Sequence, residues 1–69
     1  MGNDVEVRDS HNLIIGWVKD VGDRLIATHI RKGYVGSYTK SSDITTDGKG
    51  NIYCFGNGCS SIIREVNNE

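Results

Sequence analysis

Short runs of apolar and β-branched residues alternate along the chain with clusters of glycine and small polar residues. The clusters recur about every ten residues, at 9–12, 20–23, 31–33, 40–43, 47–51 and 56–58. Turn residues at this spacing are typical of short antiparallel strands joined by tight connections. The pattern predicts strands over the segments 5–8, 13–19, 24–30, 34–39, 44–46, 51–55 and 60–66.

Residue preferences within these segments also favour strands. Val, Ile, Thr and Tyr dominate them, whereas Ala and Leu, two strong helix formers, total three in the whole chain. The last segment differs, because Ile62, Ile63 and Val66 stand at helical spacing and Ser60 or Ser61 suits the position before a helix. Residues 60–66 are therefore expected to form either a final strand or a short helix.

Three glycines divide the chain at a fixed interval. Gly16, Gly36 and Gly56 stand twenty residues apart, and each closes a run of mixed apolar and β-branched or aromatic residues. A fixed period of this length indicates a repeated supersecondary unit, here a hairpin. Because a residue without Cβ allows a neighbouring hairpin to approach or a strand to bend, we expect these glycines to be structural and to lie around a common axis.

These observations predict one all-β domain spanning residues 1–69. It is an antiparallel meander of about seven short strands, radial or barrel-like, with hairpin repeats at about 5–19, 24–39 and 43–58. The expected core consists of Val5, Val7, Leu13, Ile15, Trp17, Leu25, Ala27, Val35, Ile44, Ile52, Cys54, Ile62 and Val66. An odd number of strands leaves at least one open edge, and open edges recruit partners.

Two segments share one pattern, VRDSHNLIIGWV (7–18) and ITTDGKGNIYCFG (44–56). In each, a strand is followed by an Asp/Gly turn and then by a strand that ends in an apolar residue and glycine. This pattern resembles the four-fold beta-flower proteins, small bacterial domains of radially arranged hairpins. The middle segment LIATHIRKGYVGSY (25–38) lacks the Asp. The resemblance implies a radial hairpin fold and carries no catalytic residues with it.

The sequence predicts neither a membrane span nor an export signal. Apolar residues make up 36% of the chain and are spread along it, far from the roughly 20 consecutive residues that a transmembrane helix needs. The first residues carry neither a basic segment nor an apolar one, so we expect a cytoplasmic protein.

Net charge is −1, but residues 24–49 carry five bases against two acids. Within this part, the segment 28–40 interleaves basic and aromatic side chains in the way that single-stranded nucleic acid is held. The residues concerned are His29, Arg31, Lys32, Tyr34, Tyr38 and Lys40. Since a dedicated nucleic-acid binder is usually strongly basic, nucleic acid is an alternative partner and not the leading one.

Trp17 supports a second ligand hypothesis. The sequence Gly16-Trp17 followed by VKD resembles the start of choline- or glucan-binding cell-wall repeats, which bind through several aromatic residues per repeat. This chain has one Trp, three Tyr and one Phe in total. Trp17 is therefore interpreted first as a core or interface anchor, and cell-wall glycan is a less favoured ligand.

Cys54, Cys59, His11 and His29 lack the spacing of a zinc site, so no metal and no cofactor is expected. A hairpin turn at 56–57 would set Cys54 opposite Cys59, whereas a turn at 57–58 would pair Cys54 with Ser61. Cys54 and Cys59 therefore form either a disulfide or two free thiols, and a reducing cytoplasm favours the free thiols.

No motif indicates catalysis. Asp9, Ser10 and His11 are adjacent, whereas catalytic triads are assembled from distant segments, and the loop DGKGN (47–51) lacks the alternating acids of a calcium site. The sequence therefore predicts a non-enzymatic structural or interaction domain that self-associates or docks on a protein partner. The alternative is a ligand-binding module for single-stranded nucleic acid or cell-wall glycan.

Overall fold

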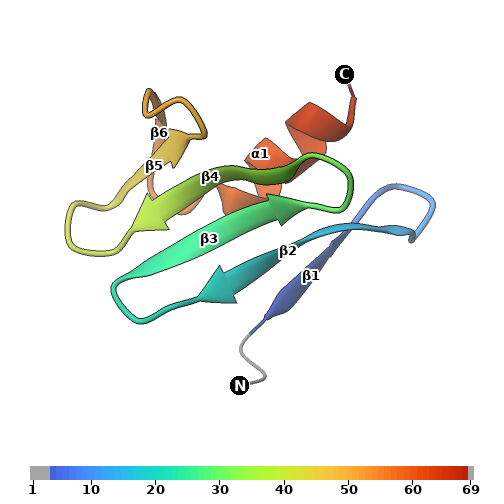
Figure 1. The fold of residues 1–69 in the computed structure, drawn as a ribbon, viewed down its shortest axis with the longest axis horizontal. Coiled ribbons are helices and arrows are strands. Elements are labelled where there is room, and N and C mark those ends of the chain that lie inside the picture. Colours follow the sequence, from blue (N-terminus) through green and yellow to red (C-terminus); the bar gives the residue numbers. More distant parts are fainter. Residues whose placement is uncertain (1–3, 69) are drawn as a thin grey trace.

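A computed structural model describes residues 4–68 as six strands followed by one helix (Figure 1). These elements are β1 (Val5–Arg8), β2 (Ile14–Asp20), β3 (Arg24–His29), β4 (Gly33–Thr39), β5 (Ile44–Asp47), β6 (Ile52–Phe55) and α1 (Cys59–Asn67). Each strand pairs antiparallel with the next, in the order β1 to β6. The antiparallel meander is thus confirmed, but the sheet is open with edges at β1 and β6, so barrel closure is not.

Residues 60–66, which were expected to form either a seventh strand or a short helix, belong to the helix α1. It begins at Cys59, with Gly58 as its N-cap, and not at Ser60 or Ser61. Gly58 has no side chain to cap the helix, so other groups hold this end. Asn57 Oδ1 accepts a hydrogen bond from the Cys59 N–H at 3.2 Å, which satisfies one of the free donors of the first turn.

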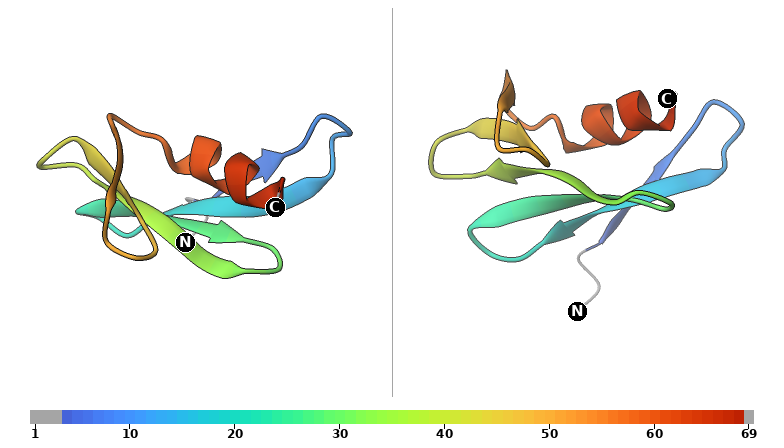
Figure 2. Two further views of the ribbon diagram at one scale, coloured as in Figure 1. Left: turned by 90° about the horizontal axis from the view of Figure 1, so that it is seen from above. Right: turned by 45° about the horizontal axis from the view of Figure 1, so that its top comes forward.

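Thr45 fixes the chain between β6 and α1. Its side chain is fully buried, its hydroxyl donates to the Gly56 carbonyl at 2.6 Å, and its Oγ1 accepts from the Gly58 N–H at 2.9 Å. The connection therefore leads the chain back over the sheet. As Figure 2 shows, α1 lies across one face, where it contacts mainly β2, β3 and β4.

Each of the three hairpins carries an irregularity in its second strand. The pairing register skips Ile15 in β2, Val35 in β4 and Tyr53 in β6. An extra residue of this kind is a β-bulge, and it interrupts the strict alternation of side chains between the two faces. Two consecutive residues of each second strand therefore face α1.

The bulges correct part of the expected core. Because Tyr53 is the extra residue of β6, Ile52 and Cys54 lie on opposite faces, and Ile52 is 61% exposed. Leu13 lies in the turn before β2 and Val5 on the edge strand, so both are exposed as well. These three residues were wrongly predicted to be buried.

The core lies between the sheet and α1. Its buried members are Val7, Ile15, Val18, Ala27, Val35, Cys59, Ile62 and Ile63, and its partly buried members are Leu25, Tyr38, Tyr53 and Val66. The expected burial of Val7, Ile15, Ala27, Val35 and Ile62 is confirmed. Trp17, Ile44 and Cys54 are half-buried. Val18, Cys59 and Ile63 are core residues that the strand pattern missed.

Gly16 and Gly36 lie where α1 crosses the sheet. A Cβ atom on Gly16 would lie 2.8 Å from Ile63 Cγ2, and one on Gly36 would lie 2.9 Å from Ile62 Cδ1. Gly56 differs, because it follows β6, has a φ of 83° and has no atom within 4 Å of its side-chain position. Two of the three glycines are therefore equivalent, and the expected common axis through all three is not formed.

In the third hairpin, the residue after the bulge is Cys54. The equivalent cross-strand pairs are Val7 with Gly16, Ala27 with Gly36 and Thr45 with Cys54. The separation within each pair is the same, so the three hairpins correspond, but the third begins two residues early. The twenty-residue interval from Gly36 to Gly56 thus does not reflect equivalent positions.

Candidate interaction surface

Within residues 4–68, no element covers the sheet face opposite α1 (Figure 2). Cross-strand pairing places the side chains of this open face in four rows. The rows are Arg8 and Ile14; Glu6, Trp17, Thr28 and Tyr34; Lys19, Ile26, Ser37, Thr46 and Ile52; and Arg24, Thr39, Ile44 and Phe55.

Charge is distributed unevenly over the open face. Its charged side chains are those of Glu6, Arg8, Lys19 and Arg24, all on β1, β2 or the first residue of β3. The remainder carries apolar and hydroxyl side chains alone. We call this remainder the uncharged patch, which consists of Ile14, Trp17, Ile26, Thr28, Tyr34, Ser37, Thr39, Ile44, Thr46, Ile52 and Phe55.

The uncharged patch holds some of the most exposed large apolar side chains of the described residues. Phe55 is 78% exposed, Ile52 61% and Tyr34 52%. The Tyr34 hydroxyl donates to Ser37 Oγ at 3.4 Å, which links two of the rows. Aromatic enrichment and depletion of charge are what distinguish the centre of a protein interface from ordinary surface.

His29, one of the residues predicted to bind a ligand, is instead buried on the helix side of the sheet. Its Nδ1 accepts from the backbone N–H groups of Arg31 at 3.1 Å and Lys32 at 3.3 Å, and its Nε2 lies 3.1 Å from Asn67 Oδ1. Since Nδ1 is an acceptor, the neutral ring carries its proton on Nε2 and donates it to Asn67. His29 therefore joins the β3–β4 turn to the end of α1.

Tyr38 and Lys40 also make local structural contacts. The Tyr38 hydroxyl donates to Asp43 Oδ1 at 2.6 Å, and this hydrogen bond raises the pKa of Tyr38. Lys40 Nζ lies 3.1 Å from both carboxylate oxygens of Asp20. Tyr38 is on the helix side, paired with Leu25, so it does not share a face with Tyr34.

The segment 28–40 consequently spreads over both faces and both ends of its hairpin. Arg31 and Lys32 lie in the turn between β3 and β4, whereas Lys40 follows the opposite end of β4 (Figure 1). The single basic aromatic face that nucleic-acid binding requires is not formed. Of the predicted site residues, Trp17 and Tyr34 lie together on the open face, on either side of Thr28.

Asp20 is expected to make part of the stability depend on pH. A hydrogen bond from the Gly22 N–H, and then the Lys40 ammonium, lower the pKa of Asp20 below its usual 3.8. A lowered folded-state pKa stabilises the fold above the unfolded value, and this contribution is lost as the pH falls below 3.8 through the folded-state pKa.

The variant Asp20→Asn should therefore be less stable than the wild type in urea unfolding at neutral pH, with the difference shrinking at about pH 3. Asp23→Asn removes a carboxylate from the same turn, 3.7 Å from Arg24 Nε in an exposed pair, and serves as the control. An equal loss at both pH values in Asp20→Asn would contradict the assignment.

Both cysteines are free thiols in the structure. After β6 the chain enters α1 and forms no further hairpin, so neither of the two expected pairings of Cys54 exists. Cys59 is fully buried, its Sγ lies 3.8 Å from the Leu25 carbonyl oxygen, and burial raises the pKa of its thiol.

Thiol titration of the unreduced protein is expected to count two thiols after unfolding in urea, with Cys59 unreactive before unfolding. The thiolate is the reactive form, so burial and a raised pKa both slow the reaction of Cys59 relative to Cys54. A count of zero thiols after unfolding would show a disulfide instead.

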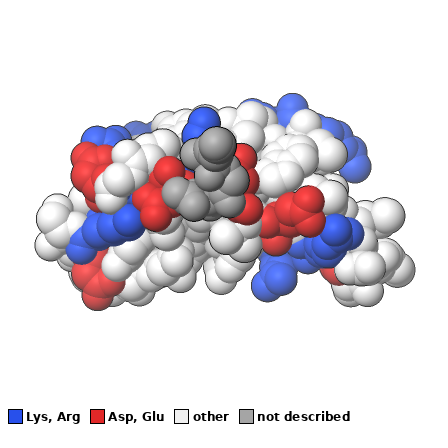
Figure 3. All heavy atoms as spheres, turned by 90° about the horizontal axis from the view of Figure 1, so that it is seen from below, with Lys and Arg blue, Asp and Glu red and all other residues white. Residues whose placement is uncertain are grey.

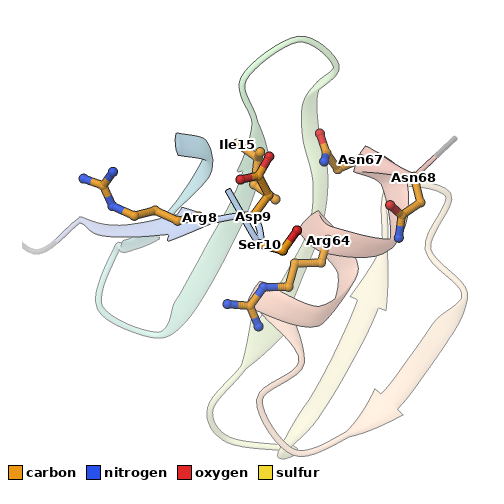
Figure 4. Close-up of a pocket in the computed structure, with 7 residues that line it drawn as sticks. All are labelled: Arg8, Asp9, Ser10, Ile15, Arg64, Asn67 and Asn68. Atoms are coloured by element: carbon orange, nitrogen blue, oxygen red, sulfur yellow. The ribbon is translucent and has the colours of Figure 1, made fainter. Parts of the chain in front are cut away.

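A hollow of about 400 Å³ lies between the β1–β2 turn and the end of α1 (Figure 4). It is lined by Arg8, Asp9, Ser10, Ile15, Arg64, Asn67 and Asn68. The Asp9 carboxylate accepts from the backbone N–H groups of Leu13 and His11, which lower its pKa, so it serves the turn. Arg8 extends away from the other lining residues and binds Glu6, so the polar groups do not converge on one point.

The charged side chains of residues 4–68 do not form a metal site, and those seen in Figure 3 do not form a basic surface. Within residues 4–68, no group of three or more His, Cys, Asp or Glu side chains is placed to hold a metal ion. On the side seen in Figure 3, acidic and basic side chains are interspersed and form no continuous basic area. The helix of this part of the chain is too short and too polar to cross a membrane.

Most of the uncharged patch was missed by reasoning from sequence. Trp17 and Tyr34 were predicted to bind, but Ile26, Ile44 and Phe55 were not. Once the bulge positions are known, period-two alternation predicts these residues on the open face, because the bulge in β6 moves Ile52 and Phe55 to the same face.

In comparisons with known proteins, no family model, curated protein or solved structure matches this chain.

Proposed function

We propose that this chain is a non-enzymatic interaction module that binds another protein through the uncharged patch. The observation that carries the proposal is the asymmetry of the sheet. One face is covered by α1, and the other presents three aromatic side chains, four isoleucines and three partly exposed threonines, with no charged side chain of β4, β5 or β6 on that face. Contiguous apolar surface of this kind marks interaction sites on small proteins.

Covering this surface supplies binding free energy. Complete burial of a Phe or Ile side chain is worth about 1.5–3 kcal/mol, and Phe55 and Ile52 at 78% and 61% exposure have most of that still to gain. The half-buried Trp17 and Ile44 add a smaller amount each. A partner that binds the open face thus gains several kcal/mol from these few side chains.

Two of the groups that a catalyst could use, His29 and Cys59, are engaged in structure. His29 uses both ring nitrogens to hold the β3–β4 turn and the end of α1. Cys59 is enclosed in the core, with a thiol whose pKa is raised by burial. These assignments support an interaction role rather than an enzymatic one.

The test compares proteins retained on the immobilised chain from an extract of the cells that produce it. The wild type is compared with Tyr34→Glu/Phe55→Glu, which places two charges on the uncharged patch. The control is Leu13→Glu/Val21→Glu, which charges two exposed apolar residues in turns away from the patch. Proteins retained by the wild type and the control but lost by the patch variant support the proposal, and equal retention by both variants contradicts it.

A further inference from the structure

We infer that the partner of the uncharged patch is a second copy of this chain, bound face to face about a two-fold axis. This inference rests on the proposed function and names the partner.

The chemistry of the patch is complementary to itself. A two-fold interface brings the same surface of two subunits together, so each group meets a group of its own set. Carboxylates or ammonium groups would repel their counterparts, whereas a Ser or Thr hydroxyl both donates and accepts hydrogen bonds. Thr28, Thr39 and Thr46 are of this kind and partly exposed, whereas Ser37 is buried and bonded to the Tyr34 hydroxyl, and the other patch residues are apolar or aromatic. With a net charge of −1 per chain, long-range repulsion between two copies is weak.

The open face is comparable in size to the smaller interfaces of stable dimers. The molecule measures 33 × 28 × 17 Å, and Figure 1 views it down the shortest axis, across the layers of sheet and helix. An ellipse drawn on the two longer extents covers about 700 Å² and outlines the whole molecule, turns included, so it is an upper limit on the flat outline of this face. Since each partner buries roughly 800 Å² of accessible surface in a standard-size interface, a dimer on this face lies at the lower end of that range.

Stacking two open faces gives a layered arrangement of helix, sheet, sheet and helix. Two sheets packed in this way lie about 10 Å apart, with the side chains of their inner faces interdigitated. The charged side chains of Glu6, Arg8, Lys19 and Arg24 then lie toward the β1 side, where they reach the solvated rim.

The sheet edges are poorer sites for a second copy. Both edge strands, β1 and β6, are four residues long, and β1 carries the exposed charges of Glu6 and Arg8. Short length and charge are features that protect an edge from pairing. The open face therefore offers the larger and less protected surface.

Molecular mass by light scattering or sedimentation, followed from about 10 μM to 1 mM, tests the inference. The wild type is expected to rise from 7.6 kDa toward twice that value. Tyr34→Glu/Phe55→Glu should weaken the dimer at least tenfold, and Leu13→Glu/Val21→Glu should behave as the wild type. All four replaced side chains are largely exposed, and thermal melts check that both variants fold.

Acrylamide quenching of Trp17 fluorescence separates face-to-face binding from edge pairing. Trp17 is the only tryptophan, and its side chain lies on the open face within the patch, on β2, one strand in from the β1 edge and four strands from β6. Its quenching should fall as the wild type dimerises. A doubled mass without this protection, or a doubled mass that the patch variant leaves unchanged, overturns the inference.

A wild-type mass of 7.6 kDa at about 1 mM also overturns the second-copy inference. If the patch-dependent capture of other proteins described above persists in that case, the proposed function stands and the partner is a different protein. If neither dimer nor patch-dependent capture is found, both fail.

Discussion

Replacing Gly16 by alanine is expected to remove most of the free energy that stabilises the fold. The new Cβ atom would collide with the Thr28 carbonyl oxygen of the neighbouring strand and would lie 2.8 Å from Ile63 Cγ2. The carbonyl belongs to paired backbone, so it cannot move without disturbing the β2–β3 register. Overpacking of this kind costs about 3 kcal/mol, and a domain of this size has only about 3–5 kcal/mol of net stability.

Urea unfolding followed by circular dichroism measures the effect, and the midpoint should fall by roughly 2–3 M. Gly36→Ala is expected to behave in the same way, because its Cβ would lie 2.5 Å from the Thr46 carbonyl oxygen and 2.9 Å from Ile62 Cδ1. Gly56→Ala is the matched control. It meets no atom, and only its positive φ opposes the substitution, at about 1–2 kcal/mol.

The outcome discriminates between two views of the evenly spaced glycines. If all three alanine variants lose the same stability, the glycines are equivalent and the close approach of α1 to β2 and β4 is not what requires them. If Gly16→Ala and Gly36→Ala are much worse than Gly56→Ala, the helix sets the requirement. Asparagine at position 56 should then be nearly neutral, because it tolerates a positive φ.

The strand pattern predicted the meander because turn residues punctuate this chain strongly. Each connection contains Gly, Asn, Asp or Ser, except 30–32, which leads directly into Gly33, and the strands between them are rich in β-branched residues. The sequence did not decide between a strand and a helix for residues 60–66, because Ser-Ser-Ile-Ile has weak helix propensity. What decides it is the packing of Ile62 and Ile63 against the sheet, which sequence alone does not reveal.

The bulges explain why the open face was harder to predict than the fold. Tyr34 and Tyr38 are four residues apart, so strict alternation places them on one face. The extra residue Val35 places them on opposite faces instead. The same effect in β6 exposes Ile52 and adds it to Phe55 on the uncharged patch. A bulge depends on pairing with the neighbouring strand, so no local pattern in these residues announces it.

Replacing Ile63 by alanine is the second change with a large expected effect. Ile63 is completely buried at the centre of the contact between α1 and the sheet, beside Gly16. Truncation of a buried isoleucine to alanine costs about 2–5 kcal/mol, since the lost burial is accompanied by a cavity that the surroundings fill only partly. Set against a net stability of about 3–5 kcal/mol, this loss should unfold a large fraction of the chain.

Ile52→Ala is the matched control, because it makes the same truncation at a side chain that is 61% exposed on the open face. Its effect on the stability of the monomer should stay within about 0.5 kcal/mol.

The helix signal in circular dichroism and the Trp17 fluorescence should change together during urea unfolding of the wild type, as in a two-state transition. Since α1 supplies Cys59, Ile62 and Ile63 to the core, the sheet should not outlast the helix. A sheet signal that persists after the helix signal is lost would show that the meander is held by its strand pairing, and not by the core between the two layers.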